Sequence, residues 1–337
     1  MSYFEHSTLS QNTIRAYEPR IHKWKDIVPG KSIEYIILFP KQSIRILAQH
    51  LKQREANEKK PVCTMTNLRN YVAAILAILR HSPHIAPTIP DRVEYYHLWL
   101  SIMNQTSEPM KERQRQHLPT VIQSNKLGSQ LTFEQLLEKR NQLAVKCSSY
   151  TADNVSSDNQ CLQDMYGHLL LSMYTYIYPV RADYYATEMI RDGHDPSVPN
   201  YLRVHSNHSD LVLRDFKTAH RYPPIEYHPL PDELHQVIVR SLVLLPRNYL
   251  FQKPNGSPFT RNTFSQWASK LLRQLFGVEM TLTLIRHQFI TTLSMDLPVT
   301  ELERIGKLMG HSLTLQRLYK WHLPSEPSEE KEENESD

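Results

Sequence analysis

The segment Leu284-Ile285-Arg286-His287-Gln288-Phe289-Ile290-Thr291 sets an arginine and a histidine side by side within a mainly apolar run. It belongs to the region from about Asp232 onward, where the sequence predicts helices. A second polar group follows in Leu308-Met309-Gly310-His311-Ser312, and Tyr319 stands eight residues beyond His311. The order and spacing of these side chains carry more information than any one of them.

Two further segments lie upstream. Tyr178-Pro179-Val180-Arg181-Ala182-Asp183 follows a predicted buried helix over about 160–178, which Asp158 and Asn159 can cap. About 35 residues later, Asp215-Phe216-Lys217-Thr218 lies in a predicted β-hairpin region. The β-like runs are 201–204, 211–213 and 224–227, and the polar run 206–210 between the first two predicted strands is typical of a turn.

Taken in order, these segments resemble the tyrosine recombinase (phage-integrase) family over about residues 130–323. The resemblance is fainter in the N-terminal part, where it rests on Leu9–Tyr17 and a helical pattern. It implies a catalytic set with a nucleophile, two arginines, a histidine and a hairpin lysine, which match Tyr319, Arg181, Arg286, His311 and Lys217.

The chemistry of the family explains these residue types. Two arginines can grip the non-bridging oxygens of a phosphate with fixed guanidinium forks, and His311 can donate a further hydrogen bond. Lys217 can protonate the departing 5′-oxygen as a general acid. Tyr319 then becomes linked to the 3′-phosphate, and a second 5′-hydroxyl can reverse the step. The resemblance implies no metal, ATP or other cofactor.

The sequence departs from the family pattern near two of these residues. Thr283 occupies the position, three before the second arginine, where the family usually has histidine, and threonine is a poor general base. His287 is expected to be structural and buried rather than a substitute base. Tyr184 replaces a frequent glutamate three residues after the first arginine, and the neighbouring Asp183 can hold Arg181 in place.

Charge is distributed unevenly along the chain. The formal net charge is only +4, but the last stretch, 325–337, contains seven of the 35 acidic and one of the 39 basic residues, so the remainder carries +10. A basic body with an acidic tail suits a polyanionic partner. Solvated surface is the alternative for individual basic side chains. The candidates for contact with the DNA backbone are Lys23, Lys25, Arg261, Lys270 and Arg273.

We expect a mainly α fold with a small antiparallel β-sheet. Residues 1–115 are predicted to form a helical core-binding domain, with helices starting near Ser10, at about 66–80 and at about 92–103. A polar connector, assigned mainly to 116–129, precedes a catalytic domain over 130–323. The acidic tail 324–337 is predicted to be disordered.

Composition excludes several other classes of protein. The three cysteines have no metal-ligand spacing, which favours a reducing compartment, and the sequence shows no signal peptide or membrane-length apolar run. We therefore expect an intracellular protein located with DNA, in the nucleus of a eukaryotic host or the cytoplasm of a prokaryotic one. The resemblance further implies double-stranded DNA as the partner, a homotetramer on two DNA sites, and a mobile element or virus as the source.

Two alternatives share much of this pattern. Some relatives are structural or packaging proteins that bind DNA with impaired catalysis, and Thr283 keeps that reading open. A type IB topoisomerase-like enzyme would use the same chemistry to relax supercoiled DNA without a defined site. Formation of a covalent adduct with nicked DNA separates enzyme from binding protein, and relaxation without site preference marks the topoisomerase.

Overall fold

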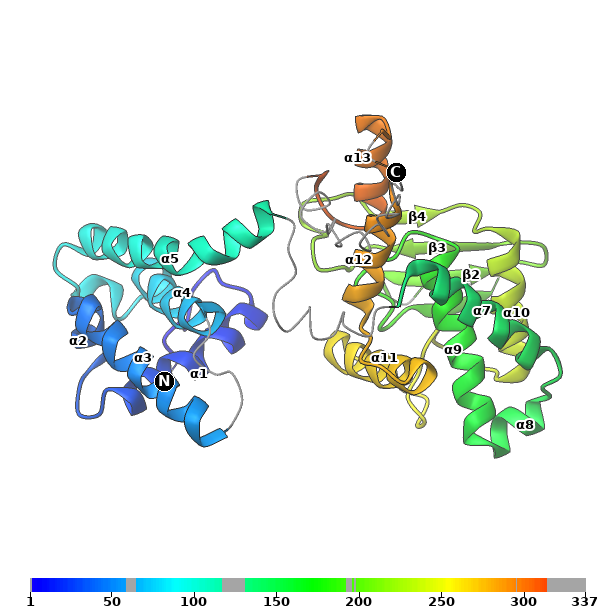
Figure 1. Cartoon of the computed structure of the whole chain (residues 1–337), viewed down its shortest axis with the longest axis horizontal. Coiled ribbons are helices and arrows are strands. Elements are labelled where there is room, and N and C mark those ends of the chain that lie inside the picture. The colour runs from blue at the N-terminus through cyan, green and yellow to red at the C-terminus, as the bar shows by residue number, and fades with distance from the viewer. Residues whose placement is uncertain are drawn as a thin grey trace, which may run out of the picture. The chain divides into compact units, whose positions relative to one another are not determined.

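A computed structural model describes residues 2–58, 65–116, 131–191, 196, 198–294 and 296–313. Its contacts divide the chain into two units, Met1–Gln116 and His117–Asp337, which are described separately. The predicted connector apart from Gln116, the proposed nucleophile Tyr319 and the acidic tail lie outside the described residues. Figure 1 shows the helices of the first unit in blue to cyan and those of the second in green to orange, around a sheet.

The first unit is helical in its described part. Its elements are α1 (Gln11–Ile27), α2 (Ile33–Leu38), α3 (Pro40–Glu58), α4 (Met65–His81), a 3₁₀ turn (Ala86–Thr88) and α5 (Arg92–Arg115). The predicted cap is present, since Ser10 Oγ accepts a hydrogen bond from the Thr13 amide at 3.2 Å. The third predicted helix was too short, because α5 continues for twelve residues beyond the predicted end at 103, to Arg115.

Two tryptophans organise the core of this unit. The rings of Trp24 and Trp99 meet edge to face with centroids 6.3 Å apart, and both are fully buried. Each indole nitrogen also finds a backbone acceptor, the Tyr71 carbonyl at 3.3 Å for Trp24 and the Ile37 carbonyl at 3.0 Å for Trp99. The two side chains therefore tie α1 and α5 to α4 and α2, and α4 packs against both α1 and α5.

The second unit surrounds a buried helix. Its helices are α7 (Phe133–Ser148), α8 (Ala152–Ser157), α9 (Asn159–Thr175), α10 (Asp232–Leu244), α11 (Arg261–Phe276), α12 (Leu282–Thr292) and α13 (Val299–Leu308). Asp158 caps α9, as predicted, by accepting from the Gln160 amide at 2.8 Å. Helix α9 packs against α7, α8, α10 and α11, and Gly167 admits Leu275 so closely that a Cβ atom there would lie 2.7 Å from it.

The sheet has four strands in the order β1-β2-β3-β4. They are β1 (Glu188–Arg191), β2 (Asn200–Val204), β3 (Ser209–Leu213) and β4 (Ile225–Tyr227). The mainly helical class is confirmed, and the three predicted strands are present. The expectation of a purely antiparallel sheet was wrong, because β1 was not predicted and pairs with β2 in parallel. No helix among the described residues is long and apolar enough to span a bilayer.

Candidate active site

The turn after α13 is the centre of the candidate site. Helix α13 ends at Leu308, and Gly310 takes a left-handed conformation with φ of 65°. This conformation allows the Gly310 and His311 amides to donate to the carbonyls of Lys307 and Gly306 at 3.0 and 2.9 Å, which closes the helix end. The turn after α13 therefore directs the Met309 and Gly310 carbonyls toward other elements.

Arg286 reaches this turn from α12 and is fully buried. Its Nη1 donates to the carbonyls of Pro179 and Met309, both at 2.9 Å, and its Nη2 lies 2.6 Å from His311 Nδ1. A guanidinium has only donors, so His311 Nδ1 must accept, and the proton of a neutral His311 then sits on Nε2. Arg286 thus fixes both the turn and the tautomer of His311.

Arg181 reaches the same turn from the segment after α9. Its Nη1 donates to the Gly310 carbonyl at 3.0 Å, and the same oxygen accepts from Thr218 Oγ1 at 2.7 Å. The Arg181 backbone is held in turn, since Tyr174 donates its hydroxyl to the Arg181 carbonyl at 2.5 Å. Arg181 is half-buried, whereas Arg286 is not exposed at all, so Arg181 is the more accessible guanidinium.

Lys217 lies in the loop between β3 and β4, with its side chain exposed. Its two neighbours anchor the loop at the turn. Thr218 bonds the Gly310 carbonyl, and the Phe216 ring passes so close that a Cβ at Gly310 would lie 3.3 Å from it. Four of the five predicted catalytic residues are therefore brought together around residues 309–311, with Lys217 placed by the residues on either side of it.

Asp183, which was expected to hold Arg181, forms its ion pair with Arg261 instead. Asp183 is buried, and Arg261, the first residue of α11, approaches its Oδ1 with Nε at 3.3 Å. Burial raises the pKa of Asp183, while the positive charges of Arg261, Arg286 and Arg181 oppose that rise. Arg261 also lies 3.7 Å from Asp215 and stacks over the Tyr185 ring. The predicted DNA contact Arg261 is thus placed where it organises the site.

Asn200 links this carboxylate segment to the Lys217 loop. Its Nδ2 donates to the carbonyls of Asp183 and Asp215 at 3.2 and 2.8 Å. Its Oδ1 accepts from the amides of Arg214 and Asp215 at 2.9 and 2.7 Å. One buried amide side chain at the start of β2 therefore clamps together the two segments that carry Arg181 and Lys217, and nothing in the sequence alone singled it out.

The buried charge of Asp183 leads to a testable prediction. Because the folded-state pKa of Asp183 is raised, the charged form destabilises the fold at pH values above that raised pKa, and the penalty disappears below the ordinary value of 3.8. We expect Asp183→Asn to raise the urea midpoint at neutral pH and to lose this advantage below pH 3.8. An unchanged or lowered midpoint at neutral pH would show that the ion pair with Arg261 outweighs burial.

The remaining predicted residues of the site are placed as follows. Thr283, at the general-base position, is exposed on the first turn of α12. His287 is buried immediately after Arg286, and Tyr184 is fully buried with its hydroxyl 3.4 Å from the Met173 carbonyl. Tyr319 lies outside the described residues.

Known proteins offer limited comparison. No protein-family model and no curated protein matches this sequence. Among solved structures, the chain is similar to the XerA recombinase. The two share 15% sequence identity with a TM-score of 0.36, and the match covers 94% of this chain and 89% of the other. The side chains themselves must supply the functional argument.

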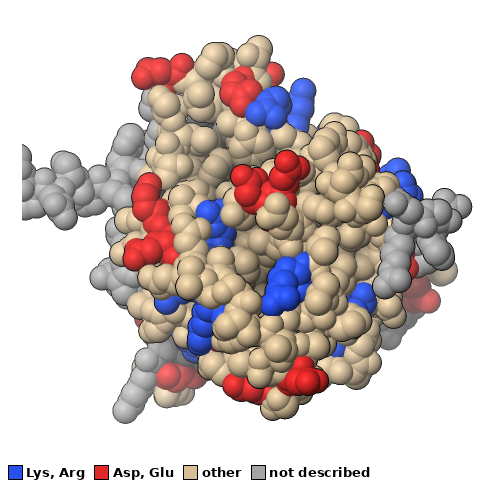
Figure 2. Space-filling view, turned by 90° about the vertical axis from the view of Figure 1, so that its right-hand side faces the viewer, with Lys and Arg blue, Asp and Glu red and all other residues tan. Residues whose placement is uncertain are grey.

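Basic side chains line a groove on each unit. In the second unit, a hollow of about 370 Å³ beside the start of α12 is lined by Lys270 and Arg273, both predicted contacts, but also by Glu279, which lies 3.8 Å from Arg273. Figure 2, by contrast, shows a face on which basic and acidic side chains are interspersed, as on ordinary solvated surface.

The groove of the first unit is richer in positive charge. It measures about 460 Å³ and is lined by four basic side chains from α1 and α3, namely Arg15, Arg20, Lys23 and Arg54. Of these four side chains, Arg15 and Arg20 were not among the predicted contacts, although Arg20 and Lys23 are three residues apart on α1 and so lie on one face of the helix. Lys25, the other candidate on α1, instead lies over the Tyr3 ring at 5.4 Å.

Proposed function

We propose that this protein cleaves and rejoins DNA strands through a covalent 3′-phosphotyrosine intermediate, as a site-specific recombinase. The observation that carries the proposal is the convergence of Arg181, Arg286 and His311 on one turn, with the Lys217 loop anchored to the same turn. These residues come from four separate segments of the second unit, and together they supply positive charge and hydrogen-bond donors of the kind that a phosphodiester in reaction requires.

Each side chain has a role that its surroundings support. Arg181 is accessible enough to contact a phosphate oxygen, and Arg286 contributes positive charge from beneath while holding the turn in place. His311 carries its proton on Nε2 when neutral and is assigned to donate to a second non-bridging oxygen; because the ring is buried, the phosphate must displace the groups that cover it. The negative charge that builds on the phosphate is thereby neutralised by groups already fixed by the protein.

Proton transfer and nucleophilic attack complete the reaction. The exposed ammonium of Lys217 can give its proton to the departing 5′-oxygen. Tyr319 gives up its phenolic proton to water or to a DNA phosphate oxygen, and its oxygen forms the new bond to phosphorus as the bond to the 5′-oxygen breaks. Eight residues separate Tyr319 from His311, and an extended chain of that length reaches about 27 Å, so the spacing in sequence allows the phenol to reach the phosphate.

The proposed DNA surface comprises the groove between α1 and α3 and the hollow beside the start of α12. Phosphate contacts release counterions, so each one lost reduces the slope of log affinity against log salt by about 0.9. We expect the double substitution Arg15→Gln and Lys23→Gln to weaken DNA binding and to lower that slope by about 1.8, as measured by fluorescence anisotropy over a salt series. Lys52→Gln, an exposed change on α3 outside the groove, is the matched control. Equal effects from both proteins would place the DNA elsewhere.

Covalent capture tests the proposal directly. A duplex nicked near the cleavage position loses the short 5′-hydroxyl strand by diffusion, which traps the enzyme on the 3′-phosphate. We expect a complex that survives denaturation and disappears after protease digestion, without added metal or ATP. A protein that is retained on the same DNA but yields no adduct with any duplex from its own gene's flanks would support the alternative of a structural or packaging protein.

A further inference from the structure

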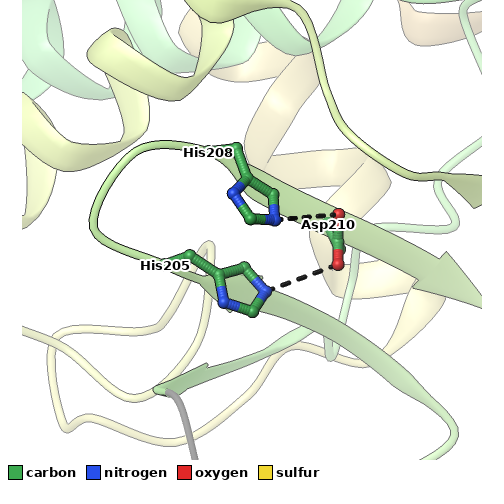
Figure 3. Close-up of side chains that lie close together, drawn as sticks. All are labelled: His205, His208 and Asp210. Carbon is green, nitrogen blue, oxygen red and sulfur yellow. Dashed lines mark ion pairs between the residues drawn. The ribbon is translucent and has the colours of Figure 1, made fainter.

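Three histidines gather around one carboxylate at the far end of the β2–β3 hairpin. His205 and His208 belong to the turn, Asp210 follows on β3, and His228 comes directly after β4. Figure 3 shows the His205 and His208 rings stacked beside the Asp210 carboxylate. Because the hairpin begins at Asn200 near the candidate active site and runs the length of β2 to this turn, the cluster stands apart from the phosphate-binding side chains.

We propose that this cluster is a binding site for a divalent metal ion of the zinc type, held by His205, His208, His228 and Asp210. The proposal does not rest on the function inferred above. Imidazole nitrogens with a carboxylate oxygen are a preferred ligand set of Zn²⁺. The distances between the candidate ligand atoms decide whether they suit such an ion.

The spacing of the ligand atoms suits a tetrahedral ion. Ligands about 2.0–2.2 Å from zinc at tetrahedral angles lie about 3.3–3.5 Å from one another. His205 Nε2 and His228 Nδ1 both lie 3.4 Å from Asp210 Oδ2, and His208 Nε2 lies 3.9 Å from Asp210 Oδ1. The candidate ligand atoms of His205, His208 and Asp210 all fall within 4.8 Å of one another. His228 falls outside that group and His208 faces the other carboxylate oxygen, so both side chains must rotate before all four ligand atoms can meet at one ion.

An outer hydrogen bond orients His208, and a carboxylate lies behind His228 beyond hydrogen-bond distance. His208 Nδ1 lies 2.8 Å from Asn207 Oδ1, which can only accept, so the proton sits on Nδ1 and the Nε2 lone pair faces Asp210. His228 Nε2 lies 3.8 Å from Glu226, while its Nδ1 faces Asp210. A carboxylate or amide oxygen behind a ligating imidazole is the usual arrangement in zinc sites.

Both rings must turn to bind one ion. The His205 and His208 rings are stacked with centroids 4.1 Å apart and planes within 12°, and an imidazole lone pair lies in its ring plane, so the two lone pairs do not aim at one point as the rings stand. Binding of a metal ion requires both imidazoles to be neutral, and the ion supplies one positive charge centre that all the ligating side chains contact. Arg203 of β2 stands opposite Asp210 of β3 in the strand register, but its guanidinium lies over the Tyr201 ring.

The base of the cluster is held rigidly. Ser209, between His208 and Asp210, shares a 2.8 Å hydrogen bond with the buried His235 of α10, and its carbonyl accepts from the Leu230 amide at 2.8 Å. A bound ion would therefore link the β2–β3 turn to the end of β4 and stabilise the sheet edge against α10. The expected consequence is greater stability of the second unit when the metal is present.

The test is Zn²⁺ titration of the untagged full-length chain after treatment with chelator. We expect one ion per chain by calorimetry, a raised melting temperature, and visible absorption typical of tetrahedral coordination when Co²⁺ replaces Zn²⁺. Asp210→Asn and His208→Gln should each weaken affinity by at least about 10-fold, and Asn207→Ala should weaken it by a similar factor through the outer shell.

The matched control is His97→Gln, an exposed histidine on α5 of the other unit, which should leave affinity and stoichiometry unchanged. Melting temperatures without metal show whether each variant is folded. Wild-type protein that binds Zn²⁺ no more tightly than Asp210→Asn would overturn the proposal. An equal loss in His97→Gln would overturn it as well, since binding would then be spread over surface histidines.

Discussion

Substitution of Tyr319 by phenylalanine is expected to abolish covalent capture of nicked DNA while leaving DNA affinity nearly unchanged. The substitution removes only the phenolic oxygen, which is the atom that would bond to phosphorus, and keeps the aromatic ring. Loss of a nucleophile usually lowers the rate by at least about 10³-fold. The measurement is the fraction of labelled DNA in a denaturation-resistant complex with time, compared with anisotropy of the same duplex.

The matched control for this experiment is Tyr249→Phe, a half-buried tyrosine of the same unit between α10 and α11. This variant should form the adduct at the wild-type rate. Persistence of the adduct in Tyr319→Phe would assign the nucleophile to another residue and would remove the chemical basis of the proposed mechanism, even if DNA binding remained.

Arg286→Ala is expected to lower the free energy of unfolding of the second unit by about 3–5 kcal/mol. The substitution deletes a buried charge that serves the carbonyls of Pro179 and Met309 and the Nδ1 of His311, so three buried acceptors lose their donor and a cavity opens. Urea unfolding followed by circular dichroism measures the change. Arg286→Lys keeps the charge with a single nitrogen and should recover only part of the loss.

The control for stability is Arg304→Ala on α13. Arg304 is largely exposed and pairs with Glu301 at 2.7 Å, so its removal should cost less than about 1 kcal/mol. If Arg286→Ala proves no more destabilising than Arg304→Ala, the hydrogen bonds at the turn contribute little, and Arg286 would have to act on the substrate alone. A large stability loss instead identifies Arg286 as the structural centre of the site.

Periodicity and composition predicted much of the fold. Local features of the sequence predicted the caps Ser10 and Asp158, helix α4 and three of the strands. Caps depend on hydrogen bonds between near neighbours, and helices and strands on the spacing of apolar residues. Strand β1 was missed, because Glu188-Met189-Ile190-Arg191 shows no apolar alternation and is a strand only through its parallel pairing with distant β2.

The candidate site was predicted by residue order, but its internal contacts were not. A charged residue inside an apolar helical run gives no local sign that it will be wholly buried, as Arg286 is. The link from Arg181 to the Gly310 carbonyl spans 129 residues, and the clamp at Asn200 is likewise formed between distant segments. The run 206–210 indicated only a turn, because His228 comes close to Asp210 only through the fold.

The turn at residues 309–311 connects the separate segments of the candidate site. Its carbonyls and imidazole receive Arg181, Thr218 and Arg286 together, and Tyr319 follows it within eight residues on the same chain. A displacement of the chain beyond His311 would therefore act on both guanidiniums and on the Lys217 loop. In the proposed reaction, positioning of Tyr319 and binding of the phosphate would then be coupled.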